Sequence, residues 1–99
     1  MMPALRNFDT AATVEIELFG VPRLLTGERS VQVAARTLGE VTQQLGRAHP
    51  ILLGTVLDGA DCWLLNGYTF VVDDCFSRNP ETAVAPGMPV FLVSSGAGG

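Results

Sequence analysis

The residues with the clearest capacity for chemistry are the last two, Gly98 and Gly99. A strand-like run from Val90 to Val93 leads to them through the small residues 94–97. Because glycine has no Cβ, such a tail can enter a channel too narrow for side chains. A partner enzyme could then reach the carboxylate of Gly99. The sequence therefore predicts a reactive C-terminus, although an inert frayed end would have the same composition.

Other reactive side chains are few and scattered. Cys62 and Cys75 stand at the edges of apolar segments, which suggests reduced, structural thiols. Together with His49, beside Pro50, they supply too few ligands for a metal site. The cations are all arginines, so the N-terminal amine is the only primary amine able to accept an acyl group.

Composition narrows the classes of partner. The 99 residues suit one domain with a modest core. A net charge of −4 and a pI near 4.6 argue against nucleic acid or an anionic membrane as a partner, and favour a basic protein surface. No signal-type leader is recognisable, and no apolar run approaches the roughly 20 residues that span a bilayer. We expect a soluble, cytoplasmic protein.

The first half of the chain predicts a leader, two strands and a helix. Residues 1–12 show no period and are expected to be mobile. Alternation from Thr13 to Leu18 predicts a strand, and alternation at 30–33 predicts a second one, joined to the first by a long irregular loop. Thr37 and Glu40 fit a capping box at the start of a helix. Its expected apolar stripe is Leu38, Val41, Leu45 and Ala48.

The second half predicts a hairpin and a final strand. Asn66-Gly67 separates Cys62–Leu65 from Tyr68–Val72, as in a two-residue type I′ turn. Residues 73–89 are rich in turn formers, and Val90–Ser94 reads as the last strand. The expected fold is α+β, with one main helix packed on one face of a small mixed sheet. We expect a domain over 13–94 and a flexible tail over 95–99.

Three stretches resemble the ubiquitin-like sulfur carriers of the β-grasp fold, the family of the molybdopterin synthase small subunit and the thiamin sulfur carrier. They are Leu18–Arg23 with Thr26-Gly27, Leu65–Gly67 before Thr69-Phe70, and Val90–Gly99. The resemblance covers residues 13–99. In contrast to the common family pattern, Met88 follows Gly87, and serines follow the last strand.

The resemblance implies a protein cosubstrate rather than an enzyme. An E1-like adenylating enzyme would use ATP to activate the carboxylate of Gly99 at the end of the Gly98-Gly99 tail. A sulfur donor protein would then convert it to a thiocarboxylate, which a sulfur-accepting synthase would use. The carrier itself would bind no cofactor and no metal.

The resemblance and the alternation together imply a partner-binding face on the sheet, away from the helix. Phe19 alternates onto the same face as Glu15 and Glu17, and the resemblance adds Phe70 and Phe91 or Val93. Each of these could instead lie in the core. Arg23, in the first loop, is either a charged contact or a solvated side chain.

Three functions therefore remain open. The first is a sulfur carrier in molybdopterin, thiamin, cysteine or secondary-metabolite synthesis. The second is a covalent protein modifier joined through Gly99, which could not build chains on its own side chains because it has no lysine. The third is a β-grasp interaction module with an inert tail.

Overall fold

The computed structural model describes residues 13–95, which form a five-stranded mixed sheet and one main helix. Residues 1–12 and 96–99, on which the expected leader and most of the expected tail fall, lie outside the described residues. The elements in chain order are β1 (Thr13–Leu18), α2 (Val21–Thr26), β2 (Ser30–Ala34), α3 (Leu38–Ala48), the short 3₁₀ helix η1 (Pro50–Leu52), β3 (Tyr68–Val72), β4 (Cys75–Ser77) and β5 (Val90–Ser94).

The last strand of the chain is the middle strand of the sheet. The strand order is β2-β1-β5-β3-β4. β5 runs parallel to β1, with Leu18 opposite Leu92, and antiparallel to β3, with Phe70 opposite Leu92. Because β5 has a neighbour on each side, the segment leading to the C-terminus leaves the sheet from its centre.

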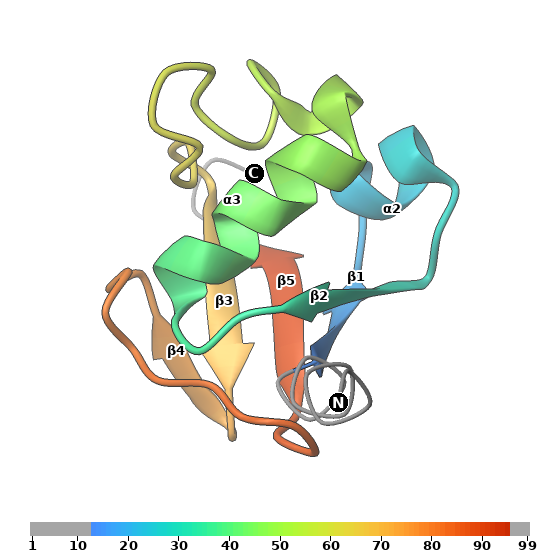
Figure 1. Cartoon of the computed structure of the whole chain (residues 1–99). Coiled ribbons are helices and arrows are strands. Elements are labelled where there is room, and N and C mark those ends of the chain that lie inside the picture. Colours follow the sequence, from blue (N-terminus) through green and yellow to red (C-terminus); the bar gives the residue numbers. More distant parts are fainter. Residues whose placement is uncertain (1–12, 96–99) are drawn as a thin grey trace, which may run out of the picture.

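Helix α3 lies across one face of the sheet, and the core fills the space between them (Figure 1). The expected α+β architecture is therefore confirmed. From the helix the core receives Leu38, Val41 and Leu45, whereas Ala48, which we placed in the apolar stripe, is exposed. Within residues 13–95, no helix has the length and apolar character needed to cross a membrane.

The start of α3 matches its sequence signature with one change. Thr37 is the N-cap, and its hydroxyl accepts a hydrogen bond from the Glu40 amide (3.2 Å). The Glu40 carboxylate accepts from the Arg36 amide (2.7 Å) rather than from Thr37. The amides of Leu38 and Gly39 donate to carbonyls of the 78–85 segment, so this turn-rich stretch helps to cap the helix.

The connection between β1 and β2 is not the irregular loop expected from its glycines. Residues 21–26 form the short helix α2, with Pro22 in its first turn, where a missing amide hydrogen costs nothing. Gly27 ends α2 in the left-handed conformation (φ 74°), which glycine adopts without strain. The prediction of an irregular loop was wrong because Pro22 and Gly27 mark the two ends of a short helix.

The predicted hairpin across Asn66-Gly67 was also wrong. Cys62–Leu65 forms no strand, and β3 pairs with β5 and β4. The tight hairpin joins β3 to β4 through Asp73 and Asp74, which both have positive φ (51° and 72°), as a type I′ turn requires. Asp-Asp is a weaker turn signal than Asn-Gly, which explains the misassignment.

Candidate functional site

The base of the C-terminal tail is held to the sheet up to Ser95. Ser94 lies opposite Tyr68 at the last β3–β5 pair, and the Ser95 amide donates to the carbonyl of Gly67 (2.7 Å). Gly98 and Gly99 lie outside the described residues. Four residues, 96–99, follow Ser95, and such a segment spans at most about 14 Å. Any enzyme that reaches the Gly99 carboxylate must therefore approach this end of the sheet closely.

Phe19 and α2 lie at the same end of the sheet. Because β1 and β5 are parallel, both strands finish there, and the Phe19 amide donates to the Leu92 carbonyl (3.2 Å). Arg23 is exposed on α2, which follows directly. Phe19 is thus close to the end of β5, and Arg23 follows it by four residues in the chain.

The sheet face opposite α3 carries aromatic side chains. Phe19 is 37% exposed and contacts the half-buried Phe91 edge to face, with ring centroids 5.7 Å apart. Val93 is half-buried two residues further along β5. The expectation that Phe19, Phe91 and Val93 share one surface agrees with their positions.

Phe70 was wrongly placed on this face. Its side chain is fully buried and its ring lies 6.2 Å from that of Trp63. The reason is strand register: residues directly opposite one another share a face, and Phe70 stands opposite the buried Leu92 rather than opposite Phe91. Phe70 is therefore a core residue and is withdrawn from the candidate partner contacts.

Two residues that sequence reasoning missed complete the face. Val71 pairs with Phe91 on one side and with Phe76 of β4 on the other, so all three point away from the helix. Phe76 is 76% exposed. The sequence carried only a weak signal for them, because Asp73-Asp74 marks the turn before the strand at 75–77 less clearly than Asn-Gly would. We call Phe19, Val71, Phe76, Phe91 and Val93 the outer-face strip.

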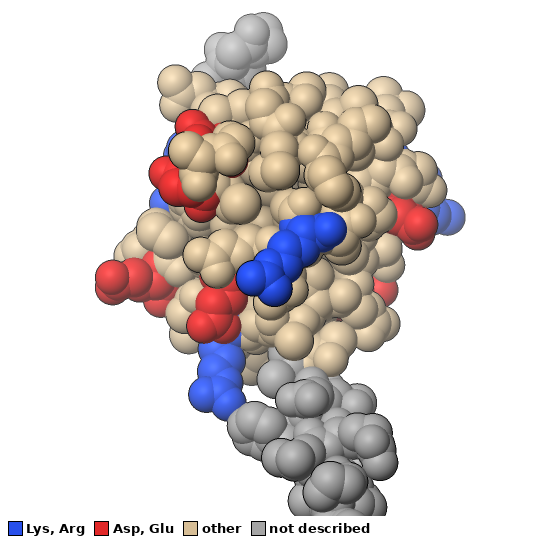
Figure 2. Space-filling model, turned by 45° about the horizontal axis from the view of Figure 1, so that its top comes forward, with Lys and Arg blue, Asp and Glu red and all other residues tan. Residues whose placement is uncertain are grey.

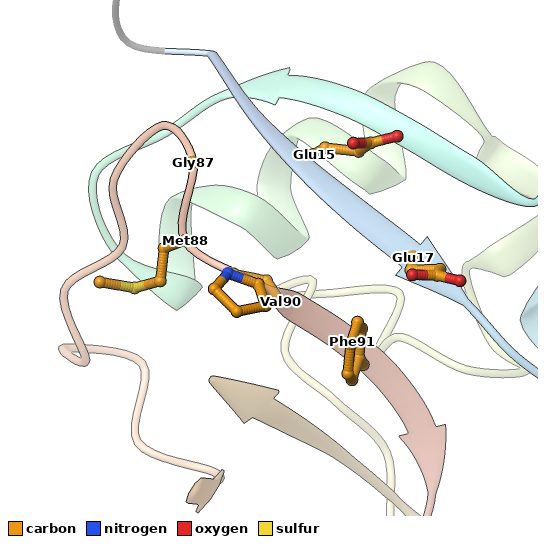
Figure 3. A pocket seen from close by; sticks show the side chains of 7 residues that line it. Glu15, Glu17, Gly87, Met88, Val90 and Phe91 are labelled. Carbon is orange, nitrogen blue, oxygen red and sulfur yellow. The ribbon is translucent and has the colours of Figure 1, made fainter. Parts of the chain in front are cut away.

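An acidic cleft borders the outer-face strip (Figure 3). It has a volume of about 350 Å³ and is lined by Glu15 and Glu17 of β1, by Phe91, and by the turn before β5 that contains Met88. The Glu15 carboxylate accepts a hydrogen bond from the hydroxyl of Ser30 (2.8 Å). Carboxylates beside an aromatic ring favour a basic side chain as the complementary group.

Metal ligands and thiols are few among the described residues. No group of three or more His, Cys, Asp or Glu side chains in residues 13–95 could hold a metal ion. The thiols of Cys62 and Cys75 are free, and Cys75 is exposed. On the face seen in Figure 2, most of the surface is uncharged, and acidic and basic side chains lie beside one another in several places.

Comparison with known proteins shows which fold this is. No protein-family model and no curated sequence matches the chain. Among solved structures, it is similar to small archaeal modifier protein 1 (SAMP1) from Haloferax volcanii, with a TM-score of 0.73 and 26% identity over 88% of this chain and 99% of that one. SAMP1 from Methanosarcina acetivorans gives a TM-score of 0.75 at 18% identity, over 89% and 97% of the two chains.

A third similar structure is the BexX/CysO complex from Amycolatopsis orientalis, with a TM-score of 0.68 at 22% identity over 87% of this chain and 99% of that one. These neighbours establish the β-grasp fold, and they confirm the resemblance to ubiquitin-like carriers and modifiers that the sequence indicates.

Proposed function

Because the chain is a ubiquitin-like β-grasp protein, similar to small carrier and modifier proteins rather than to enzymes, we propose that it is a sulfur carrier activated at Gly99. The observation that carries the proposal is the position of β5: this central strand ends at Ser94, five residues before Gly99, so the chain leaves the sheet from its centre. The outer-face strip next to this exit supports it.

The chemistry requires little from the carrier itself. A carboxylate is a poor electrophile, so an E1-like enzyme first forms the acyl adenylate of Gly99 from ATP and releases pyrophosphate. The terminal sulfur of a persulfide on a sulfur donor protein then attacks the acyl carbon and displaces AMP. A thiol cleaves the resulting acyl disulfide by forming a disulfide with the donor's sulfur, which leaves a thiocarboxylate on Gly99. A sulfur-accepting synthase consumes the sulfur. The carrier contributes the tail that bears the carboxylate and the surface on which its partners dock.

The proposed docking face is the outer-face strip together with the acidic cleft. Aromatic side chains at the centre of an interface contribute most of its binding energy, and Phe76 and Phe19 are exposed enough to be buried by a partner. Glu15 and Glu17 would pair with basic groups of that partner. Arg23 lies on the α2 side of the exit and is a candidate contact at the rim.

Mass spectrometry tests the proposal directly. After incubation with the cognate E1-like enzyme, ATP and a sulfur donor, the C-terminal peptide should gain the mass difference between sulfur and oxygen, localised to Gly99. A shift on Cys62 or Cys75 with an unchanged C-terminal peptide would contradict the sulfur-carrier function.

Covalent modification is the second candidate, and it is favoured by the similarity to proteins named as modifiers. In that case Gly99 would form an isopeptide bond with an amine of a target protein. Since the chain contains no lysine, side-chain-linked polymers of the protein itself should not form. The same mass spectrometry distinguishes the outcomes, because a conjugate gains the mass of its target whereas a thiocarboxylate does not.

We expect Phe76→Ala to weaken docking of the E1-like enzyme while leaving the fold intact. Phe76 is 76% exposed in the free protein, so its truncation removes little core packing, whereas loss of an interface aromatic costs on the order of 2 kcal/mol in binding. The dissociation constant should rise about thirtyfold in calorimetry or interferometry. Ile51→Ala is a matched control, because Ile51 is 53% exposed but lies on η1, outside the strip and outside α2. Equal effects of the two variants would argue against docking on the strip.

A further inference from the structure

The loop that holds the base of the tail is itself held by a guanidinium. Arg78 follows β4 immediately, and its side chain donates to three backbone carbonyls. Nη2 donates to Leu64 (3.3 Å), and Nη1 donates to Leu65 (3.3 Å) and to Tyr68. Arginine suits this task because its planar fork carries five donors and stays charged at every relevant pH.

The guanidinium bonds to a part of β3 that has no partner residue on β4. β4 ends at Ser77, opposite Phe70, whereas β3 begins earlier, at Tyr68. In an antiparallel pair of strands, hydrogen-bonded residue pairs alternate with pairs that are not hydrogen-bonded to each other. The Ser95 amide bonds to the Gly67 carbonyl, so the next pair, Tyr68 and Ser94, is of the second kind. The backbone carbonyl of Tyr68 therefore points away from β5, towards the β4 side. The Arg78 side chain lies on that side and donates a hydrogen bond to the Tyr68 carbonyl.

Gly67 and Tyr68 are therefore clamped from both sides. On one side Arg78 bonds to Tyr68, and on the other Ser95 bonds to Gly67 (2.7 Å). The start of the loop has its own support, because the Leu65 amide donates to the Val56 carbonyl (2.9 Å). Loss of Arg78 should thus loosen the Gly67 end of the loop without unfolding its beginning.

We propose that Arg78 is a positioning residue, which sets the direction in which the tail leaves the sheet and thereby the rate at which the Gly99 carboxylate is activated. The influence passes from the guanidinium through Tyr68 and Gly67 to Ser95. The effect on rate rests on the proposed function, whereas the effect on Ser95 is a property of the free protein. Small displacements of a reacting group are costly, so a loosened base should slow the reaction.

The test compares Arg78→Gln and Arg78→Lys with the matched control Arg47→Gln, which removes the same charge from the exposed side of α3. In the free protein, NMR hydrogen exchange of the Ser95 amide should be roughly tenfold faster in Arg78→Gln than in the wild type, as loss of its supporting hydrogen bonds implies. Arg78→Lys, which keeps one donor group, should be intermediate. Arg47→Gln should match the wild type.

Activation is measured by ATP–pyrophosphate exchange with the cognate E1-like enzyme. For Arg78→Gln, kcat should fall about tenfold while KM stays within about twofold, because the outer-face strip is unchanged and only tail placement suffers. A general loss of folded protein would instead lower the active concentration, which melting curves of all variants reveal. Should Arg78→Gln not fold, Arg78→Lys serves for the same comparison.

Each outcome bears on a separate step. Unchanged Ser95 exchange in Arg78→Gln overturns the clamp. Faster exchange with an unchanged kcat would contradict the positioning role, but would still support the hydrogen-bonded clamp around Gly67 and Tyr68. Absence of activation in every variant, wild type included, contradicts the proposed function, while the exchange result still decides the clamp.

Discussion

Deletion of Gly99 is expected to abolish activation of the chain by its E1-like partner. The shortened tail ends in the carboxylate of Gly98, which lies one residue, about 3.5 Å, behind the position that the partner's active site requires. Because a misplacement of about 1 Å can cost a hundredfold in rate, we expect ATP–pyrophosphate exchange to fall at least about a hundredfold. The folded domain should be unaffected, since the last strand ends at Ser94.

The matched control is Ala97→Gly, which changes the tail but keeps its length and its terminal carboxylate. This variant should be activated at close to the wild-type rate, and both variants should show the circular dichroism and melting temperature of the parent protein. If the deletion variant were adenylated at the wild-type rate, the exact position of the terminal carboxylate would not control activation, which contradicts this prediction.

Phe70→Ala is expected to destabilise the fold by about 3 to 5 kcal/mol, the range found for truncation of a buried phenylalanine. Phe70 is fully buried, pairs with Leu92 at the centre of the sheet and contacts Trp63. Total stabilities of about 5 to 15 kcal/mol are usual for single domains, so this change removes a large share of the free energy of unfolding.

Urea unfolding followed by the fluorescence of Trp63, the sole tryptophan, measures this loss. Phe76→Ala is the control on the same hairpin, with an expected change within about 0.5 kcal/mol because its ring is exposed. If both variants unfolded at the same urea concentration, the register that separates Phe70 from the outer-face strip would be wrong.

The local sequence was sufficient to predict features that depend only on residues close together in the chain. The alternation in β1 predicts which side chains enter the core, because strand side chains point to opposite faces in turn. Thr37 and Glu40 predict the start of α3, because a cap is built from residues three apart. The same locality explains why the Gly98-Gly99 tail and the exposed Phe19 could be singled out.

Turn-forming residues predicted the hairpins poorly, because a hairpin forms only where the strands on the two sides of the turn pair with each other. Asn66-Gly67 has the composition of a tight hairpin, yet the strand after it pairs with β5, far along the chain. The true tight turn at Asp73-Asp74 became recognisable only from the backbone of the two residues. For that reason β4, and with it Phe76, was absent from the expected sheet.

By itself, the sequence predicted the α+β class and the helix over 38–48, since each depends on periodicity or composition within a short segment. It also singled out Gly98 and Gly99 as the candidate reactive residues. Tertiary structure alone decided which face Phe70 occupies, because register with Leu92 is a contact between distant strands. It also decided that Arg78 supports the loop beneath the tail. An exposed arginine in a turn has no local pattern to mark it, and only the folded chain brings its donors to carbonyls at least ten residues away.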